Sequence, residues 1–95
     1  MAISKEKVAE LIGRRIRELR QKKGMTMEAL SVYSDMEYIQ LSRIERGKIN
    51  TTIFQVYKIS KALSEPMPKL FEPFTKDIME TRDHSNGANS EKPNE

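Results

Sequence analysis

The apolar residues of this chain recur at spacings of three and four residues in three separate segments. Such spacing lines one face of an α-helix, which has 3.6 residues per turn. No segment alternates apolar and polar residues for longer than a few positions, as a strand would. The sequence therefore predicts an all-α protein with short turns. A length of 95 residues gives room for one such core.

The first helix is expected over residues 4–23. Ser4 is suited to cap its N-terminus, and Gly24 can adopt the left-handed conformation that ends a helix. The residues expected to face the core are Val8, Ile12, Ile16 and Leu19.

Two short helices should follow. Thr26 can cap a helix from Met27 to about Ser34, and a third helix is expected from Tyr38 to Arg46, where Gly47 ends it. Between them, Asp35 is the residue best able to tolerate a positive φ. The expected core residues of this pair are Leu30, Leu41 and Ile44.

Thr52 and Gln55 have the T-x-x-Q spacing of a capping box and predict the start of a fourth helix. Its expected inward stripe is Ile53, Val56, Ile59 and Leu63. Pro66 and Pro68 interrupt the chain afterwards, which leaves residues 69–74 for a short fifth helix.

Charge and composition divide the chain into a domain over residues 1–75 and a polar tail over 76–95 that we expect to be mobile. The first part holds 14 basic and 9 acidic residues, a net charge of +5, while the tail holds 3 basic and 5 acidic residues. A basic domain of this size favours a polyanionic partner.

The sequence lacks the residues of several common catalytic and metal sites. It has no cysteine and one histidine, His84, so disulfides, thiolate catalysis, Cys-bearing metal sites and a Ser-His-Asp triad are excluded. We expect no enzyme activity, no metal, no cofactor and no small-molecule effector. No apolar run approaches the roughly 18 to 20 residues of a membrane span, and the sequence start lacks a signal peptide, so we expect a cytosolic protein without membrane contact.

The two short helices over about residues 26–47 form the pattern of a helix-turn-helix. The turn between them is too tight for the helices to run parallel, and polar and aromatic side chains open the second helix. A helix presented in this way can enter the major groove of DNA, which is roughly 12 Å wide, and contact base edges through its N-terminal residues.

At these positions the chain resembles the Cro/C1-type helix-turn-helix family, also called the xenobiotic response element family, which is typified by phage repressors of the lambda type. The matching segments are Ile12-Gly13-Arg14-Arg15-Ile16-Arg17-Glu18-Leu19-Arg20, then Leu30, then Leu41-Ser42-Arg43-Ile44-Glu45-Arg46-Gly47, and Ile59-Ser60-Lys61-Ala62-Leu63. The resemblance covers about residues 10–72 and implies a compact, lambda-repressor-like domain of five helices. It also implies sequence-specific binding of double-stranded DNA, usually by a dimer.

The resemblance places Glu37, Tyr38, Ile39, Gln40 and Arg43 where members of the family meet bases or the adjoining backbone. Their chemistry suits this role. An amide can pair with adenine, a guanidinium with guanine, a carboxylate can accept a hydrogen bond from cytosine, and an aliphatic side chain can contact the thymine methyl group.

Contacts to phosphate are expected from a second set of residues. These are Thr26, Arg46, Lys48 and Asn50, with Arg14 and Arg17 as further candidates.

Two other groups have structural interpretations. The resemblance assigns Arg20 and Glu45 to a largely buried ion pair between the third helix and the first. Met67, Phe71 and Phe74 cannot all be buried by so short a helix, so an exposed apolar patch there is a candidate dimer interface.

One alternative affects the third helix. Ser34 and Glu37 fit the S-x-x-E pattern of a capping box, so this helix can also be interpreted as beginning one turn earlier. The residues that contact bases would then shift toward Asp35 and Met36.

The sequence thus favours a transcription regulator, most simply a repressor, that binds a partly palindromic operator as a homodimer. A DNA-binding antitoxin or a restriction-modification controller has the same architecture and stays open. A non-catalytic protein-protein adapter is the alternative from another class.

Overall fold

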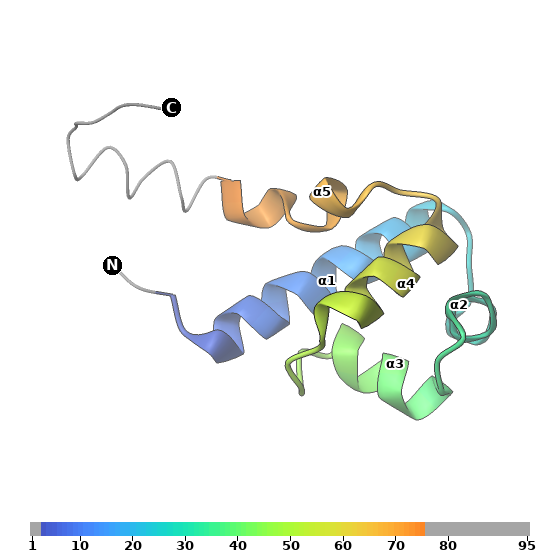
Figure 1. Ribbon diagram of the computed structural model, residues 1–95, viewed down its shortest axis with the longest axis horizontal. Helices are drawn as coiled ribbons and strands as arrows, with labels where there is room; N and C mark the ends of the chain where they lie inside the picture. The colour runs from blue at the N-terminus through green and yellow to red at the C-terminus, as the bar shows by residue number, and fades with distance from the viewer. Residues whose placement is uncertain (1–2, 76–95) are drawn as a thin grey trace.

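The computed structural model describes residues 3–75, and the helical fold predicted from the sequence is confirmed (Figure 1). In chain order the elements are α1 (Lys5–Lys22), α2 (Met27–Ser34), α3 (Tyr38–Glu45), α4 (Ile53–Leu63), α5 (Met67–Leu70) and a 3-10 helix, η1 (Glu72–Phe74). Figure 1 shows α1 and α4 side by side, α5 along one side of this pair, α3 along the other, and α2 at one end. No strand occurs among residues 3–75.

The helices begin where local chemistry can satisfy their first backbone N–H groups. In each of the three predicted N-caps, Ser4, Thr26 and Thr52, the hydroxyl accepts a hydrogen bond from the backbone N–H three residues later, at 3.0–3.1 Å. The capping box at α4 is only half formed, because Gln55 Oε1 accepts from the Thr51 hydroxyl at 2.6 Å. Asp35 ends α2 with a φ of 55°, as predicted.

The alternative start of α3 is wrong. Ser34 is the last residue of α2 and is buried, and its hydroxyl donates to the Leu30 carbonyl at 2.6 Å instead of capping the next helix. The helix α3 therefore begins at Tyr38, with Glu37 as an N-cap whose side chain makes no capping hydrogen bond.

The core lies where the four main helices meet. Its fully or almost fully buried apolar residues are Ile12, Ile16, Leu19, Leu30, Met36, Leu41, Ile44, Val56, Ile59, Leu63 and Leu70. One inward prediction is wrong, because the side chain of Ile53 is 71% exposed. Ile53 is the first residue of α4 and lies between the two sides of the helix. Of the residues one turn later, Val56 is buried and Tyr57 is exposed.

The fifth helix differs from the prediction in its bounds. The helix α5 starts two residues before the predicted Lys69, since Pro68 is tolerated in a first turn that needs no hydrogen bond from its nitrogen. Pro73 has no N–H to donate to the Lys69 carbonyl, so the α-helix stops and η1 follows. The Lys69 carbonyl instead accepts from Arg15 Nε at 2.9 Å.

The predicted exposed patch near the end of the domain is also not found. Met67, Phe71 and Phe74 are half-buried and pack against the core. The large apolar residues exposed among residues 3–75 are Val32, Tyr33, Tyr38, Ile39, Ile53, Phe54 and Tyr57. The predictions for the tail, including those for His84, concern residues 76–95, which lie outside the described part of the chain.

Candidate nucleic-acid interface

The two faces of α3 have different surroundings. Leu41 and Ile44 on the inner face are at most 2% exposed, so packing against the core fixes the rotation of the helix. The opposite face carries Tyr38, Ile39 and Arg43, which are all exposed. Because α2 and α3 pack together across the tight turn at Asp35, this outer face is held as the outer surface of a helix-turn-helix.

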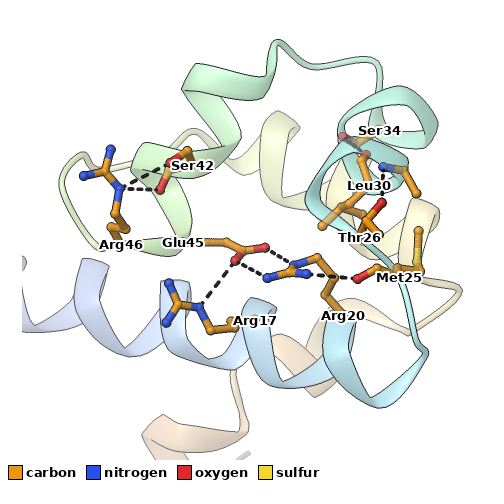
Figure 2. Close-up of polar contacts among 10 residues, drawn as sticks. Arg17, Arg20, Met25, Thr26, Leu30, Ser34, Ser42, Glu45 and Arg46 are labelled. Atoms are coloured by element: carbon orange, nitrogen blue, oxygen red, sulfur yellow. Dashed lines mark hydrogen bonds and ion pairs between the residues drawn. The ribbon is translucent and has the colours of Figure 1, made fainter.

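A buried ion pair fixes the C-terminal end of α3 (Figure 2). The side chain of Glu45 is completely buried, and its two oxygens accept from Arg20 Nε at 2.7 Å and Nη2 at 3.0 Å. Arg20 also donates from Nη1 to the Met25 carbonyl at 2.9 Å, just before α2 begins. The pair proposed from the resemblance thus lies together in the structure, and it connects α1, α3 and the segment that leads into α2.

The close packing of α1 against α3 also depends on a glycine. A Cβ added to Gly13 of α1 would lie 2.6 Å from the Glu45 carbonyl oxygen, so only glycine lets the backbones of α1 and α3 approach this closely. Gly47 has a φ of 71°, and a Cβ there would lie 2.7 Å from the Glu10 Cα. Close approach of two backbones leaves no periodic signal in the sequence, so this role of Gly13 could not be predicted from the sequence.

The five predicted base-contacting residues do not all lie alike. Tyr38, Ile39 and Arg43 share the outer face of α3, and Glu37 is exposed at its N-terminal end. Gln40 is half-buried, which leaves it less surface for a ligand. Among residues 3–75, Arg43 has no acidic partner in an ion pair, so its guanidinium is available for an external acceptor. Contact of these residues with DNA stays a prediction.

The predicted phosphate-contacting residues flank α3 on both sides. Thr26 is exposed at the N-terminus of α2, where its hydroxyl oxygen accepts from the Ala29 N–H and its hydroxyl proton can still be donated (Figure 2). Arg46, at the end of α3, is exposed and donates from Nε to the Ser42 hydroxyl at 3.2 Å, which leaves its two terminal nitrogens for other acceptors. Lys48 and Asn50 are exposed in the loop before α4.

Arg14 and Arg17 have partners within the domain. Arg14 pairs with Glu10 at 3.1 Å, and Arg17 Nε lies 3.6 Å from Glu45 Oε1. Arg17 therefore joins the ion pair of Arg20 and Glu45 as a second cation, which was not predicted from the sequence. Ile49 was also missed: it is half-buried against the core and holds the loop that carries Lys48 and Asn50.

The described residues offer little that is typical of a catalytic site. Across residues 3–75 no group of three or more His, Cys, Asp or Glu side chains could hold a metal ion. No helix in this range has the length and apolar character needed to cross a membrane. Around α3, the exposed basic residues Arg43, Arg46 and Lys48 are instead suited to binding a polyanion over an extended surface.

Comparison with known proteins identifies the architecture. A family model described as a helix-turn-helix matches residues 16–70. An uncharacterised HTH-type transcriptional regulator of Sinorhizobium fredii, y4dJ, is 33% identical over 64 residues, which cover 67% of this chain and 83% of that protein. The control protein C.BamHI of Bacillus amyloliquefaciens is 38% identical over 66 residues, which cover 68% of this chain and 80% of that protein.

A solved structure shows the same fold in a complex. The restriction-modification controller protein C.Esp1396I, as a tetramer with its natural 35 base-pair operator, superimposes with a TM-score of 0.66 at 32% identity, over 75% of this chain and 93% of that chain. The match of the family model to more than half of the chain agrees with these relatives and with the packed helix-turn-helix. The chain therefore belongs to the Cro/C1-type helix-turn-helix family.

Proposed function

We propose that this protein is a cytosolic, non-catalytic transcription regulator that binds double-stranded DNA sequence-specifically as a homodimer and represses the promoter it occupies. In this proposal the outer face of α3 enters the major groove. Glu37, Tyr38, Ile39, Gln40 and Arg43 contact base edges or the adjoining backbone. Phosphate contacts come from the residues on either side, which are Thr26, Arg46, Lys48 and Asn50.

The observation that carries the proposal is the contrast between the two faces of α3. Its inner face is fixed by Leu41, Ile44 and the buried Glu45, whereas its outer face exposes Ile39 by 63% and Tyr38 by 46%. Surface apolar groups on a short, rigidly held helix have no partner within the described domain. A major groove offers both the thymine methyl groups and the hydrogen-bonding edges that such a face can distinguish.

A restriction-modification controller is the specific form of regulator that the relatives favour. C.BamHI at 38% identity and C.Esp1396I at 32% are both controllers, whereas y4dJ has no more specific description than a transcriptional regulator. The test is genetic. A controller should be encoded beside a restriction endonuclease and a DNA methyltransferase, and its binding site should lie in their promoter region.

Selection of bound sequences from random duplex DNA, at a stated salt concentration, tests the proposed function directly. We expect enrichment of a partly palindromic site with half-sites about one helical turn, roughly 34 Å, apart. Recovery of random sequences after several rounds would contradict specific binding. If no duplex is retained at all at moderate salt, the adapter alternative, in which the domain binds another protein, becomes the better account.

A further inference from the structure

The N-terminal half of the helix α4 is apolar on its outer side as well as on its inner side. Val56, Ile59 and Leu63 are buried on the inner side. The opposite side should be polar in a surface helix, but it begins with Ile53 and Phe54 and continues with Tyr57 one turn later. A stretch of helix that is apolar on all sides is normally covered by other parts of a protein. In the described domain nothing covers the outer side of α4.

The aromatic side chains on α4 meet one more from α2. We define the aromatic face as Tyr33, Ile53, Phe54 and Tyr57, whose exposed fractions are 71%, 71%, 66% and 46%. The rings of Phe54 and Tyr57 stack with their centroids 6.5 Å apart. Together with Tyr33 they line a shallow hollow of about 550 Å³, to which no residue of α3 contributes. Occupation of the hollow would thus leave the outer face of α3 accessible.

The exposed area is large for a domain of this size. An aromatic side chain can bury about 150–250 Å², so the four exposed side chains of the aromatic face offer several hundred Å². The largest apolar patch on a typical monomer is about 300–600 Å² and often functional, and a standard interface buries about 800 Å² on each partner. The aromatic face and its rim therefore approach what one side of a stable dimer needs.

The rim of the hollow carries charged residues of both signs. Asp35 borders it on the side of α2, while Lys58 and Lys61 border it on the side of α4. Lys58 Nζ lies 5.3 Å from the centre of the Phe54 ring and donates to the Asp35 carbonyl at 2.9 Å, so the Asp35 carboxylate is still available. In a two-fold dimer whose axis runs between Asp35 and Lys61, Lys61 of each copy would face Asp35 of the other copy. This surface is thus complementary to itself.

We infer that the aromatic face is the surface on which a second copy of this chain docks, in a two-fold dimer with Phe54 and Tyr57 near its centre. The inference rests on the proposed function, because a palindromic operator needs two copies related by such an axis. It replaces the α5 region as the dimer interface, since Met67, Phe71 and Phe74 are already packed against the core.

The first test measures the mass of the full chain in solution by light scattering over a range of concentrations, without DNA. Phe54→Glu should convert the dimer to a monomer and raise its dissociation constant by about a hundredfold or more, because the aromatic ring at the centre of the interface is lost and a carboxylate would have to be removed from water there. Glutamate suits the first turn of a helix, so the thermal stability of this variant should stay near that of the wild type. The matched control is Val32→Glu, which adds the same charge at an exposed apolar residue that does not line the hollow.

A dimeric wild type, a monomeric Phe54→Glu protein and a dimeric Val32→Glu protein would support the inference. A monomeric wild type at all concentrations, or equal dimer stability in all three proteins, would overturn it. With either result, sequence-specific DNA binding, the core of the proposed function, still stands if the wild type selects a specific duplex. A wild-type protein that is dimeric but selects no specific duplex would instead contradict the proposed function.

Cross-linking locates the interface independently. The chain has no cysteine, so a single introduced thiol reports on one position only. Phe54→Cys or Tyr57→Cys should form a disulfide-linked dimer under mild oxidation, because residues near a two-fold axis oppose their own copies. Val32→Cys and Phe74→Cys should form much less. Preferential cross-linking through position 74 would place the interface at the end of the domain and overturn the inference.

Discussion

Glu45 is the residue on which the placement of α3 depends most. Its carboxylate is fully buried, yet it accepts two hydrogen bonds from Arg20 and lies near Arg17. Breaking a buried pair of this kind costs more than the pair itself contributes, because the remaining charge stays without a partner. The position of the exposed residues of α3 therefore depends on Glu45, because this residue holds the C-terminal end of the helix against α1.

Replacement of this carboxylate should therefore destabilise the domain strongly. We expect Glu45→Gln to lower the free energy of unfolding by about 3 kcal/mol, measured by urea denaturation. The control is Glu10→Gln, which removes the exposed pairs with Lys7 and Arg14 and should cost at most about 1 kcal/mol. Equal losses in the two variants would show that burial of Glu45 is not decisive.

Arg43 and Lys48 should differ in what they contribute to DNA binding. Arg43→Ala should weaken binding to the selected site by about 1–3 kcal/mol. It should weaken binding much less to a variant site in which the one base pair that Arg43 contacts has been changed. Lys48→Ala should weaken binding to all duplexes alike and reduce the slope of log affinity against log salt by about one unit. Titrations of a selected site and its single-base variants at several salt concentrations separate the two effects. Uniform loss across sequences in both proteins would refute the base contact of Arg43.

At the scale of the helices, the sequence predicts well what is decided locally. The N-caps at Ser4, Thr26 and Thr52 act over three residues, so α1, α2 and α4 begin where their patterns indicate. It predicts less well what depends on neighbours in space. The exposure of Ile53 follows from which elements pack on α4, and the start of α5 depends on how its two prolines are tolerated.

In the candidate site, too, local features follow from the sequence and contacts between distant segments do not. The outer position of Tyr38 and Arg43 follows from the helical period and the core residues between them. The half-burial of Gln40, the second cation on Glu45 and the aromatic face of α2 and α4 arise only when segments far apart in sequence meet.

The close approach of α1 and α3 at Gly13 should make this position intolerant of a larger residue. Alanine is a better helix former than glycine by roughly 0.5–1 kcal/mol, but Gly13→Ala puts a methyl group against the backbone of α3. We expect a net loss of about 1–3 kcal/mol in unfolding free energy and weaker operator binding by the folded protein, because α3 must shift. Gly24→Ala is the control. A Cβ there meets no atom within 4 Å, so the strain of its positive φ should leave α3 in place.

A Gly13→Ala protein that kept wild-type stability and wild-type operator affinity would contradict the close approach of these helices. Stability loss in both glycine variants, with reduced operator binding only for Gly13→Ala, is the expected pattern.

In the proposed dimer of the whole molecule, the distance between the two copies of α3 fixes the spacing of the DNA half-sites. Insertion of about five base pairs, half a helical turn, between the half-sites should rotate one of them away from its α3. The affinity should then fall toward that of an isolated half-site, whereas an insertion of about ten base pairs restores the facing but lengthens the separation. Competition titrations with these duplexes check the expectation. Indifference to both insertions would mean that the two copies bind independently.

The account as a whole depends on the outer face of α3 distinguishing DNA sequences. The most direct measurement is the ratio of dissociation constants for a selected operator and a scrambled duplex of the same composition, by fluorescence anisotropy at fixed physiological salt. The account predicts a ratio on the order of a thousand or more, which Arg43→Ala reduces. A ratio near one for the wild-type protein would contradict it.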